Sequence, residues 1–309
     1  MIITVTLNPA LDKTVTLPGF AVNTVNRVQS IRLDPGGKGI NVSKSVRALG
    51  GKTLAIGVLG GAAGGYIKAA LDRMGLDNDM VITGAVTRTN LKVVDPVLGT
   101  NTDINEPGSP VAAADLEKVW QKLSGVVNPG DTVVFAGKNP PEMDDGLLAD
   151  WIRKLKALDV CVCVDTVGVP MELALREKPD IIKPNQEELS ALMGRELRTT
   201  AEALDAAKEL VAQGVGLVAV SMGGDGASFV TADQCLRGYS PKVHVASTVG
   251  AGDAMMAALV HYSAAGCSLE ETARRAIAVA SATVTYSGSE PAELSTILPL
   301  IDRVRMERL

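Results

Sequence analysis

Short apolar runs alternate with longer helical patterns along most of the chain. Five of the runs lack the regular polar alternation of a half-exposed strand: TLAIGVLG, TVVFAG, VCVCVD, DIIKPN and GLVAVSMGG. Runs of this kind are typical of strands that are buried on both faces. Such strands with helices between them predict an α/β fold with a mainly parallel sheet.

Two of the intervening segments predict amphipathic helices. Residues 199–214 carry apolar side chains on one face, and a capping box of Thr199 and Glu202 marks the start of this helix. Residues 39–50 show a second such pattern, which ends at Gly50. Strands that flank a helix of this type in the chain are expected to be parallel to each other.

Two segments of the first third have no helical pattern. Residues 12–35 and 86–106 alternate between polar and apolar positions and contain turn residues. We expect them to form a small β-sheet inserted into the α/β body. No linker, low-complexity tract or repeat divides the chain, so residues 1–309 are expected to form one domain.

The composition is that of an ordinary globular protein, since 46% of the 309 residues are hydrophobic and 21% are charged. No apolar stretch predicts a membrane span, and the N-terminus lacks a signal-peptide pattern, so we expect a cytoplasmic protein without a membrane partner. A net charge of −5 and 3% aromatic residues argue against a nucleic-acid partner. The four cysteines have neither metal-ligand nor disulfide spacing and are expected in the core.

Three glycine-rich clusters stand at the end of a predicted strand or the start of a predicted helix. Their sequences are DPGGKGIN, SMGGDGAS and TVGAGDA. A single cluster of this kind usually serves only to let the chain bend. Three clusters in these places favour a site that binds anions.

The last cluster predicts an anion hole with a carboxylate beside it. Gly250, Ala251 and Gly252 allow close approach, and the following helix directs free N–H groups and the positive end of its dipole toward the anion. Asp253 then lies next to bound negative charge. From the residues alone, Asp253 is either a base for a hydroxyl group held beside that anion or a carboxylate that stabilises the helix dipole.

The common phosphate-binding motifs are absent. Lys38 is followed by Gly39 where a P-loop requires Ser or Thr. No dinucleotide-binding fingerprint follows the first strand, and the loop signatures of protein kinases are missing. Phosphoryl transfer by another architecture remains.

Three segments resemble the signature regions of one kinase family. PGGKGINVSKSVRALGG, IIKPNQEEL and STVGAGDAMMAAL are similar to the two signatures and the nucleotide motif of the ribokinase-like (PfkB) carbohydrate kinases. TVTLNPALDKTV, VNRVQ, TRTNLKVVD and TDINEPG resemble the branch that phosphorylates sugar phosphates. The resemblance spans nearly the whole chain and implies a three-layer, Rossmann-like α/β fold in which the small β-sheet is a lid.

The resemblance also implies roles on the acceptor side of the site. Asp253 would take the proton from the sugar hydroxyl, while Gly250, Ala251 and Gly252 would hold the charge of the transferred phosphoryl group. The positions that match contacts to the substrate are Asp12, Gly36, Gly37 and Asn41 for the sugar, and Arg27, Lys38 and Arg88 for its phosphate.

Some of these residues have ordinary alternatives when taken alone. Asp12 could be a turn residue and Asn41 a helix cap. Arg27 and Arg88 could be solvated surface charges.

On the nucleotide side, Lys183, Asn185 and Glu188 match a K-P-N-x-x-E element of the family. The resemblance implies that this element positions the ATP phosphates and Mg²⁺, with Asn185 and Glu188 reaching the metal largely through water. Glu188 alone could be an ordinary first-turn acid of a helix. The positions that match the loop beside the ATP phosphates and ribose are Ser221, Gly223 and Gly226, and the segment YSGSEP would lie near the adenine.

One segment departs from the family pattern. The chain reads AGKNPPEMDDG where many relatives carry a small hydroxyl residue and a glycine, in a loop that borders the sugar phosphate. Lys138 is either an added phosphate-binding cation or the mark of a different acceptor. The family also implies a monovalent-cation site, with K⁺ near ASTVG, which the sequence does not itself show, and a homodimer that forms through the lid.

The resemblance implies an ATP-dependent, Mg²⁺-requiring kinase that phosphorylates a ketohexose phosphate directly. The expected acceptor is the 6-hydroxyl of fructose 1-phosphate. Alternative acceptors are tagatose 6-phosphate, fructose 6-phosphate or an unphosphorylated sugar or nucleoside. A more distant alternative is a non-catalytic sensor of sugar phosphates.

Overall fold

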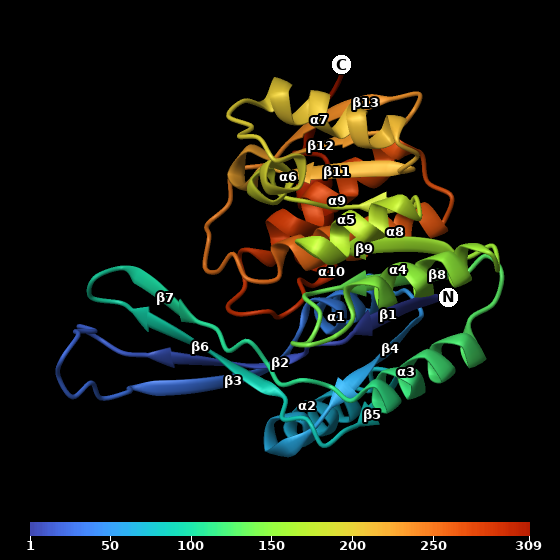
Figure 1. Ribbon diagram of the computed structural model, residues 1–309. Coiled ribbons are helices and arrows are strands. Elements are labelled where there is room, and N and C mark those ends of the chain that lie inside the picture. Colours follow the sequence, from blue (N-terminus) through green and yellow to red (C-terminus); the bar gives the residue numbers. More distant parts are fainter.

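The apolar runs form the middle of a ten-stranded sheet in the computed structural model, which describes residues 1–309 (Figure 1). The spatial order of the whole sheet is β14 (Arg305–Arg308), β13 (Cys235–Tyr239), β12 (Ala227–Val230), β11 (Leu217–Ser221), β10 (Ile181–Ile182), β9 (Cys161–Asp165), β8 (Thr132–Ala136), β1 (Ile2–Thr6), β4 (Thr53–Leu59) and β5 (Asn78–Ile82). The five runs are β4 and β8 to β11, and β1 lies between β8 and β4.

 All neighbours from β11 to β5 pair in parallel, whereas β12, β13 and β14 are antiparallel to their neighbours. The mainly parallel sheet is therefore confirmed, with an antiparallel edge that the sequence did not reveal.

Helices cover both faces of this sheet and make three layers. One face carries α3 (Ala113–Val126), α4 (Asp145–Lys156), α5 (Val169–Arg176), α6 (Gln186–Met193) and α7 (Thr200–Ala212). The other face carries α1 (Lys38–Ala48), α2 (Gly61–Arg73), α8 (Ala251–Ala264), α9 (Leu269–Thr283) and α10 (Leu294–Ile301).

Successive residues of one strand belong to different cores. In β8, Val133 and Phe135 pack in the cluster under α3 to α7, while Val134 packs against α8 and α9 on the opposite face. This alternation explains why the strands read as unbroken apolar runs, because each face of the sheet is covered.

The two predicted helices are confirmed. The helix predicted at residues 199–214 is α7, with the capping box of Thr199 and Glu202 in place, and its flanking strands β10 and β11 are parallel. The helix predicted at residues 39–50 is α1, which begins one residue earlier, at Lys38.

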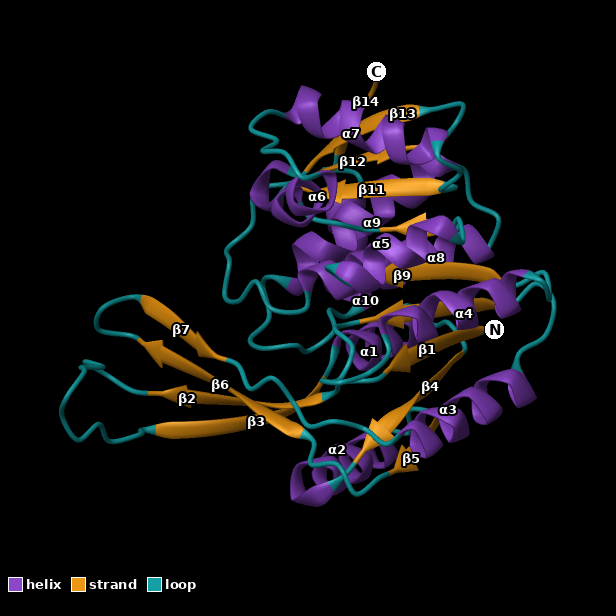
Figure 2. Cartoon of the chain, in the orientation of Figure 1, coloured by secondary structure: helices purple, strands orange, loops and turns teal.

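The segments without a helical pattern form a separate four-stranded sheet that projects from one end of the main body (Figure 2). Its spatial order is β3 (Ser30–Gly36), β2 (Ala10–Thr16), β6 (Arg88–Asp95) and β7 (Thr100–Ile104). The small inserted sheet is therefore confirmed, and its strands β2 and β3 extend slightly beyond the predicted range 12–35. Because β3 leads directly into α1, the small sheet is joined to the body at the first glycine-rich cluster, DPGGKGIN.

All four cysteines are free thiols. Cys163 is buried as expected, whereas the other three are only half-buried. None of the helices has the length and apolar character needed to cross a bilayer.

Candidate active site

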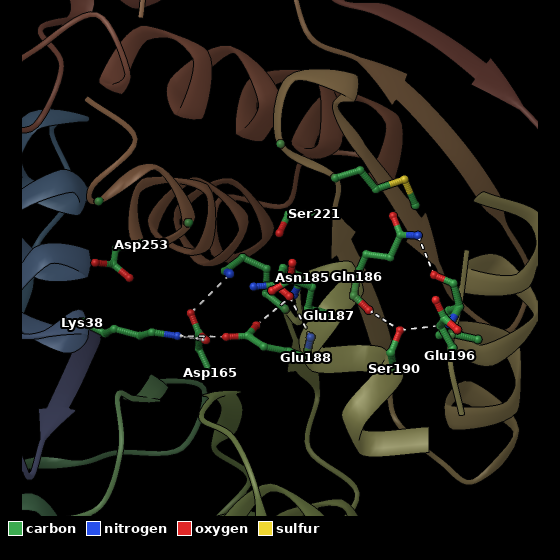
Figure 3. A pocket seen from close by; sticks show the side chains of 16 residues that line it. Lys38, Asp165, Asn185, Gln186, Glu187, Glu188, Ser190, Glu196, Ser221 and Asp253 are labelled. Atoms are coloured by element: carbon green, nitrogen blue, oxygen red, sulfur yellow. Dashed lines mark hydrogen bonds and ion pairs between the residues drawn. The ribbon is translucent and has the colours of Figure 1, made fainter. Parts of the chain in front are cut away.

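Two pockets meet beside the N-terminus of α8. The larger is an open cleft of about 950 Å³ along the carboxyl ends of β9, β10 and β11 (Figure 3). The smaller, of about 270 Å³, lies between the small sheet and α1. Lys38 lines both pockets. Ligands of open α/β sheets generally bind at the carboxyl ends of the strands, which is where this cleft lies.

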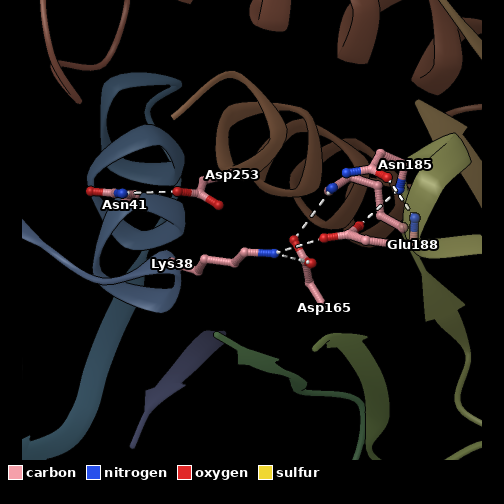
Figure 4. Close-up of polar contacts among 7 residues, drawn as sticks. Lys38, Asn41, Asp165, Asn185, Glu188 and Asp253 are labelled. Atoms are coloured by element: carbon pink, nitrogen blue, oxygen red, sulfur yellow. Dashed lines mark hydrogen bonds and ion pairs between the residues drawn. The ribbon is translucent and has the colours of Figure 1, made fainter. Parts of the chain in front are cut away.

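Asp253 stands in the first turn of α8 and is only 7% exposed. Asn41 Nδ2 donates a hydrogen bond of 2.8 Å to Asp253 Oδ2, although the two residues are 212 positions apart (Figure 4). Burial and the nearby Asp165 carboxylate raise the pKa of Asp253 to about 6, against the opposing effects of Lys38, Asn41 and Lys183. The side chain is therefore a carboxylate at neutral pH with an unusually high proton affinity.

The turn before Asp253 has the features of the predicted anion hole. Gly250 has a φ of 80°, a left-handed conformation that favours glycine, and is the N-cap of α8. The N–H groups of Gly252 and Asp253 make no backbone hydrogen bond. A Cβ atom at Gly252 would lie 3.2 Å from Lys183 Nζ. Free donors, the helix dipole and an ammonium group thus converge at one place.

A buried carboxylate holds the two lysines of the cleft. Asp165 ends β9, and its side chain is only 2% exposed. Its Oδ1 lies 2.8 Å from Lys38 Nζ, and its Oδ2 lies 3.3 Å from Lys183 Nζ. Burial alone would raise the pKa of Asp165, but the charges of Lys183 and Lys38 hold that pKa below its ordinary value.

Lys38 faces the larger cleft more than the sequence suggested. Its ammonium group pairs with Asp165 and lies 3.8 Å from Glu188 Oε1 (Figure 4). Burial opposes its charge, but Asp165, Glu188 and Asp253 raise the pKa of Lys38 above its ordinary value. Lys38 is thus a permanent cation at the boundary between the two pockets.

Asn185 and Glu188 form a capping box at the start of α6. Asn185 Oδ1 accepts a hydrogen bond of 2.7 Å from the Glu188 N–H, and Glu188 Oε2 accepts one of 2.9 Å from the Asn185 N–H. Glu188 is therefore an acid of the first turn of α6, as its ordinary alternative predicted. Glu188 Oε1 remains directed toward the cleft and Lys38.

The smaller pocket brings together most of the residues expected to bind the sugar. Its lining includes Asp12, Gly37, Lys38, Asn41 and Arg88. Asp12 lies in β2 and Asn41 inside α1, so the alternatives of a turn residue and a helix cap are wrong.

Hydrogen bonds fix the orientation of the polar groups in this pocket. Asn90 Nδ2 donates to Asp12 Oδ1 at 2.9 Å, while burial raises the pKa of Asp12 above its ordinary value. Arg88 donates to the carbonyl groups of Glu106 and Asn8. Arg88 is therefore a held side chain on the pocket wall and not a free surface charge.

The adjoining glycines are required by close packing. A Cβ atom at Gly36 would lie 2.2 Å from Asp12 Oδ2. Gly37 has a φ of 115°, and a Cβ atom there would lie 2.9 Å from Thr6 Cγ2. These glycines let the β3–α1 turn lie against the Asp12 carboxylate.

Several expected site residues lie elsewhere in this chain. Arg27 and Lys138 are exposed, make no hydrogen bond or ion pair, and line neither pocket. Ser221 and Gly223 line the larger cleft, whereas Gly226 does not. Gly226 is buried, and a Cβ atom there would lie 2.1 Å from the Gly238 carbonyl oxygen. Close packing therefore requires a glycine at this position.

The YSGSEP segment also has a different position from the one expected. Gly288 and Ser289 line the smaller pocket, together with Asp12, and not the larger cleft. The segment therefore borders the pocket of the expected sugar-binding residues.

Sequence reasoning missed two buried charged residues beside these pockets. Asp165 could have been noticed because it ends an apolar strand at the carboxyl edge of the sheet. Lys44, which is 7% exposed, carried no local signal, because it lies on the side of the helix opposite the apolar residues Val42 and Val46 that predict its inward face.

Comparison with known proteins agrees with this geometry. The family model for the pfkB family carbohydrate kinases matches residues 5–296. A 1-phosphofructokinase of Rhodobacter capsulatus is 41% identical over 278 residues, which cover 90% of this chain and 88% of the relative. A 1-phosphofructokinase of Borreliella burgdorferi is 33% identical over 308 residues, with 99% and 98% covered.

Solved structures show the same arrangement of the chain. Phosphofructokinase-2 from Escherichia coli in complex with fructose-6-phosphate superposes with a TM-score of 0.92 at 30% identity, with 98% of both chains covered. Arabidopsis thaliana ribokinase complexed with ribose and ATP superposes with a TM-score of 0.78 at 25% identity, covering 97% of this chain and 98% of the ribokinase.

The chain belongs to the pfkB family of carbohydrate kinases and has the ribokinase-like fold. It is an enzyme of an ATP-using kinase family that phosphorylates a sugar hydroxyl. The resemblance found in the signature segments is thereby confirmed over nearly the whole chain.

The raised pKa of Asp253 predicts a trade-off between function and stability. A carboxyl group with a folded pKa of about 6 and an ordinary value of 3.8 destabilises the fold when ionised, fully above pH 6 and not at all below pH 4. Asp253→Asn is expected to raise the free energy of unfolding at pH 8 by up to about 3 kcal/mol, and the gain is expected to vanish near pH 4.

Chemical denaturation at both pH values tests this expectation. Asp233→Asn is the matched control, because Asp233 is exposed and makes no ion pair. An Asp253→Asn protein that is no more stable than the wild type at pH 8 would contradict the expectation.

Proposed function

We propose that this enzyme transfers the γ-phosphoryl group of ATP to the 6-hydroxyl of D-fructose 1-phosphate. The products are fructose 1,6-bisphosphate and ADP. The observation that carries the proposal is the position of Asp253, which lines the nucleotide-sized cleft and accepts a hydrogen bond from Asn41 of the small polar pocket. The relatives named 1-phosphofructokinase, at 31% to 41% identity, support this acceptor.

The smaller pocket has the chemistry of a phosphosugar site. Asp12 and Asn41 provide acceptors and a donor for hydroxyl groups. Arg88 and Lys38 provide fixed positive charge, which a neutral sugar would leave unpaired but a sugar phosphate would neutralise. We assign Gly36 and Gly37 to the same subsite, because they bring the backbone of the turn against Asp12.

Asp253 acts as the base for the attacking hydroxyl group. Its pKa of about 6 makes it a better proton acceptor than an ordinary aspartate while it remains ionised at neutral pH. The donors of the anion hole stabilise the charge that develops on the transferred group, and Lys183 adds a cation beside Gly252. Transfer is direct and in line, without a phosphorylated enzyme intermediate.

The larger cleft would hold ATP and its magnesium ion. No group of three or more potential metal ligands exists in the chain, which fits a metal carried by the nucleotide phosphates and water. Glu188 Oε1 suits a contact through water, whereas Asn185 Oδ1 already caps α6. Bound Mg²⁺ would neutralise charge on the ATP phosphates.

Other residues of the cleft take supporting roles in this proposal. Ser221 and Gly223 would lie beside the ATP phosphates and ribose, and Gly226 would shape their loop. Lys138 would meet the sugar phosphate only if its exposed side chain turned toward the smaller pocket. The potassium named for the Escherichia coli phosphofructokinase-2 structure supports a K⁺ site near residues 246–250.

The small sheet is proposed to be a lid and the contact surface of a homodimer. Its outer connections expose apolar side chains to an unusual degree, with Val22 88%, Val25 78% and Val97 70% exposed. Arg27 lies on the same connection as Val22 and Val25 and reaches neither pocket of its own chain. We therefore assign Arg27 to the phosphosugar site of the second subunit.

The acceptor is tested by a coupled assay of ADP release with ATP and Mg²⁺. Fructose 1-phosphate is expected to give a kcat/KM at least about a hundredfold above tagatose 6-phosphate, fructose 6-phosphate and fructose, a discrimination of about 3 kcal/mol. Preference for another phosphosugar would overturn the acceptor but keep the mechanism. Turnover of none of the four sugars would overturn the proposed function.

The role of Asp253 is tested by the kinetics of Asp253→Asn. Loss of the base is expected to lower kcat by about 10²- to 10⁴-fold while both substrates still bind. In the wild type, kcat/KM is expected to fall as pH decreases through about 6, because protonation removes the base. Asp233→Asn serves again as the control, and full turnover by Asp253→Asn would support a non-catalytic role for this carboxylate.

The exchange of Arg27 between subunits is tested by complementation. Arg27→Ala is expected to raise KM for the sugar phosphate by about tenfold or more. A heterodimer of Asp253→Asn and Arg27→Ala chains, purified with two affinity tags, then contains one site with both functional residues and should recover about half of the wild-type activity. A heterodimer no more active than the mean of its parents would place Arg27 in its own chain.

The proposed lid interface is tested separately, by the oligomeric state of a charge variant. Val25→Asp is expected to yield monomers in light scattering, because a charge would be buried in the proposed interface. Ile82→Asp, at an equally apolar and 65% exposed position on β5, should leave the oligomeric state unchanged.

A further inference from the structure

Lys44 is a buried lysine that lines neither pocket. Its ammonium group donates hydrogen bonds to two segments beside the proposed phosphosugar site. It lies in α1 and is 7% exposed. Its Nζ donates to the Pro35 carbonyl oxygen at 2.9 Å and to Ser289 Oγ at 3.0 Å. These two partners come from opposite ends of the chain.

Each partner leads directly to a functional segment. Pro35 precedes Gly36, where an added Cβ atom would lie 2.2 Å from Asp12 Oδ2. Ser289 packs against the anion-hole turn, since a Cβ atom at Gly250 would lie 3.5 Å from Ser289 Cα. One ammonium group therefore joins the turn that positions Asp12 to the loop that supports Gly250.

The same ammonium group stands among carboxylates. Burial lowers the pKa of Lys44 to about 8, although the attraction of Asp34, Asp12, Asp253 and Glu290 raises that pKa. A buried ammonium group with two neutral hydrogen-bond partners costs stability, and these carboxylates offset part of that cost. By the same attraction, Lys44 favours the ionised forms of Asp12 and Asp253.

We propose that Lys44 is a positioning residue for phosphoryl transfer, which ties the Asp12 turn to the Gly250 turn and supports the charge of the Asp253 base. This inference rests on the proposed function of the two pockets. Lys44 touches no reacting atom and acts through Pro35, Ser289 and the surrounding charge.

Two effects are expected from Lys44→Met, which keeps an unbranched side chain one atom shorter and removes its charge. The kcat/KM for the sugar is expected to fall by about tenfold or more, because two charge-assisted hydrogen bonds are lost. The acid limb of the pH profile is expected to move upward by about one unit, because Asp253 loses an attractive charge and faces Asp165 with only Lys38, Lys183 and Asn41 in support.

Two further variants separate charge from packing. Lys44→Arg is expected to return the acid limb to the wild-type position. Ser289→Ala removes one partner but leaves the charge, so it should raise KM for the sugar severalfold without moving the acid limb. Lys52→Met, at an exposed lysine between α1 and β4, is the matched control and should behave as the wild type.

A denaturation cycle gives a readout that needs no acceptor. At pH 7, where Lys44 is charged and Asp253 is ionised, the stabilisation of the protein by Asp253→Asn is expected to be larger in the Lys44→Met background, because ionised Asp253 is then less well compensated. Failure of the wild type on fructose 1-phosphate would overturn the acceptor and leave this cycle to decide the role of Lys44.

The inference is overturned by additive effects in that cycle together with an unmoved acid limb in Lys44→Met. If Lys44→Met does not fold, Lys44→Arg and Ser289→Ala decide instead. Wild-type KM and kcat in Ser289→Ala would then contradict the proposed tie.

Discussion

The active site depends on the compensation of two buried carboxylates at the carboxyl end of the main sheet. Asp165 and Asp253 carry like charges in a place where each is almost wholly removed from water. Desolvation of an ion costs several kcal/mol even in a relaxed protein, so uncompensated charges here would unfold the site or become protonated. Lys38 and Lys183 supply that compensation at Asp165, which fixes the ammonium groups along the cleft. The positive charge of the cleft is therefore held in place before any phosphate arrives.

The fold brings these groups together from distant parts of the chain. Asn41 comes from α1 and Asp253 from α8, and the two helices pack side by side on one face of the sheet. Glycine permits the close approach at each contact: Gly36 against the Asp12 carboxylate and Gly252 beside the Lys183 ammonium. A side chain at Gly36 would clash with the Asp12 carboxylate, and one at Gly252 would displace the Lys183 ammonium group slightly. The glycine-rich clusters thus act through packing as well as through backbone flexibility.

Much of the fold could be predicted because burial leaves a local signature. Strands covered on both faces become unbroken apolar runs, and the capping box at Thr199 marks a helix start within four residues. The anion hole could also be predicted, because its glycines and Asp253 are contiguous in the sequence. Asp165 and Lys44 were missed because their functions arise from partners up to 245 residues away. The antiparallel edge strands were missed because their short runs have no comparable pattern.

The carboxylate that costs stability, Asp253, is also the one that we propose as the base. An aspartate in water, with a pKa near 3.9, accepts a proton from a hydroxyl group poorly. Burial and the neighbouring Asp165 raise the proton affinity of Asp253, while Asn41 and the lysines limit the rise so that the base is ionised at neutral pH. Removal of the cations would leave a protonated and inactive acid, whereas full exposure would leave a weak base. A useful pKa for Asp253 lies between these limits. Only a fold that is stable enough to offset the cost of burial can maintain it.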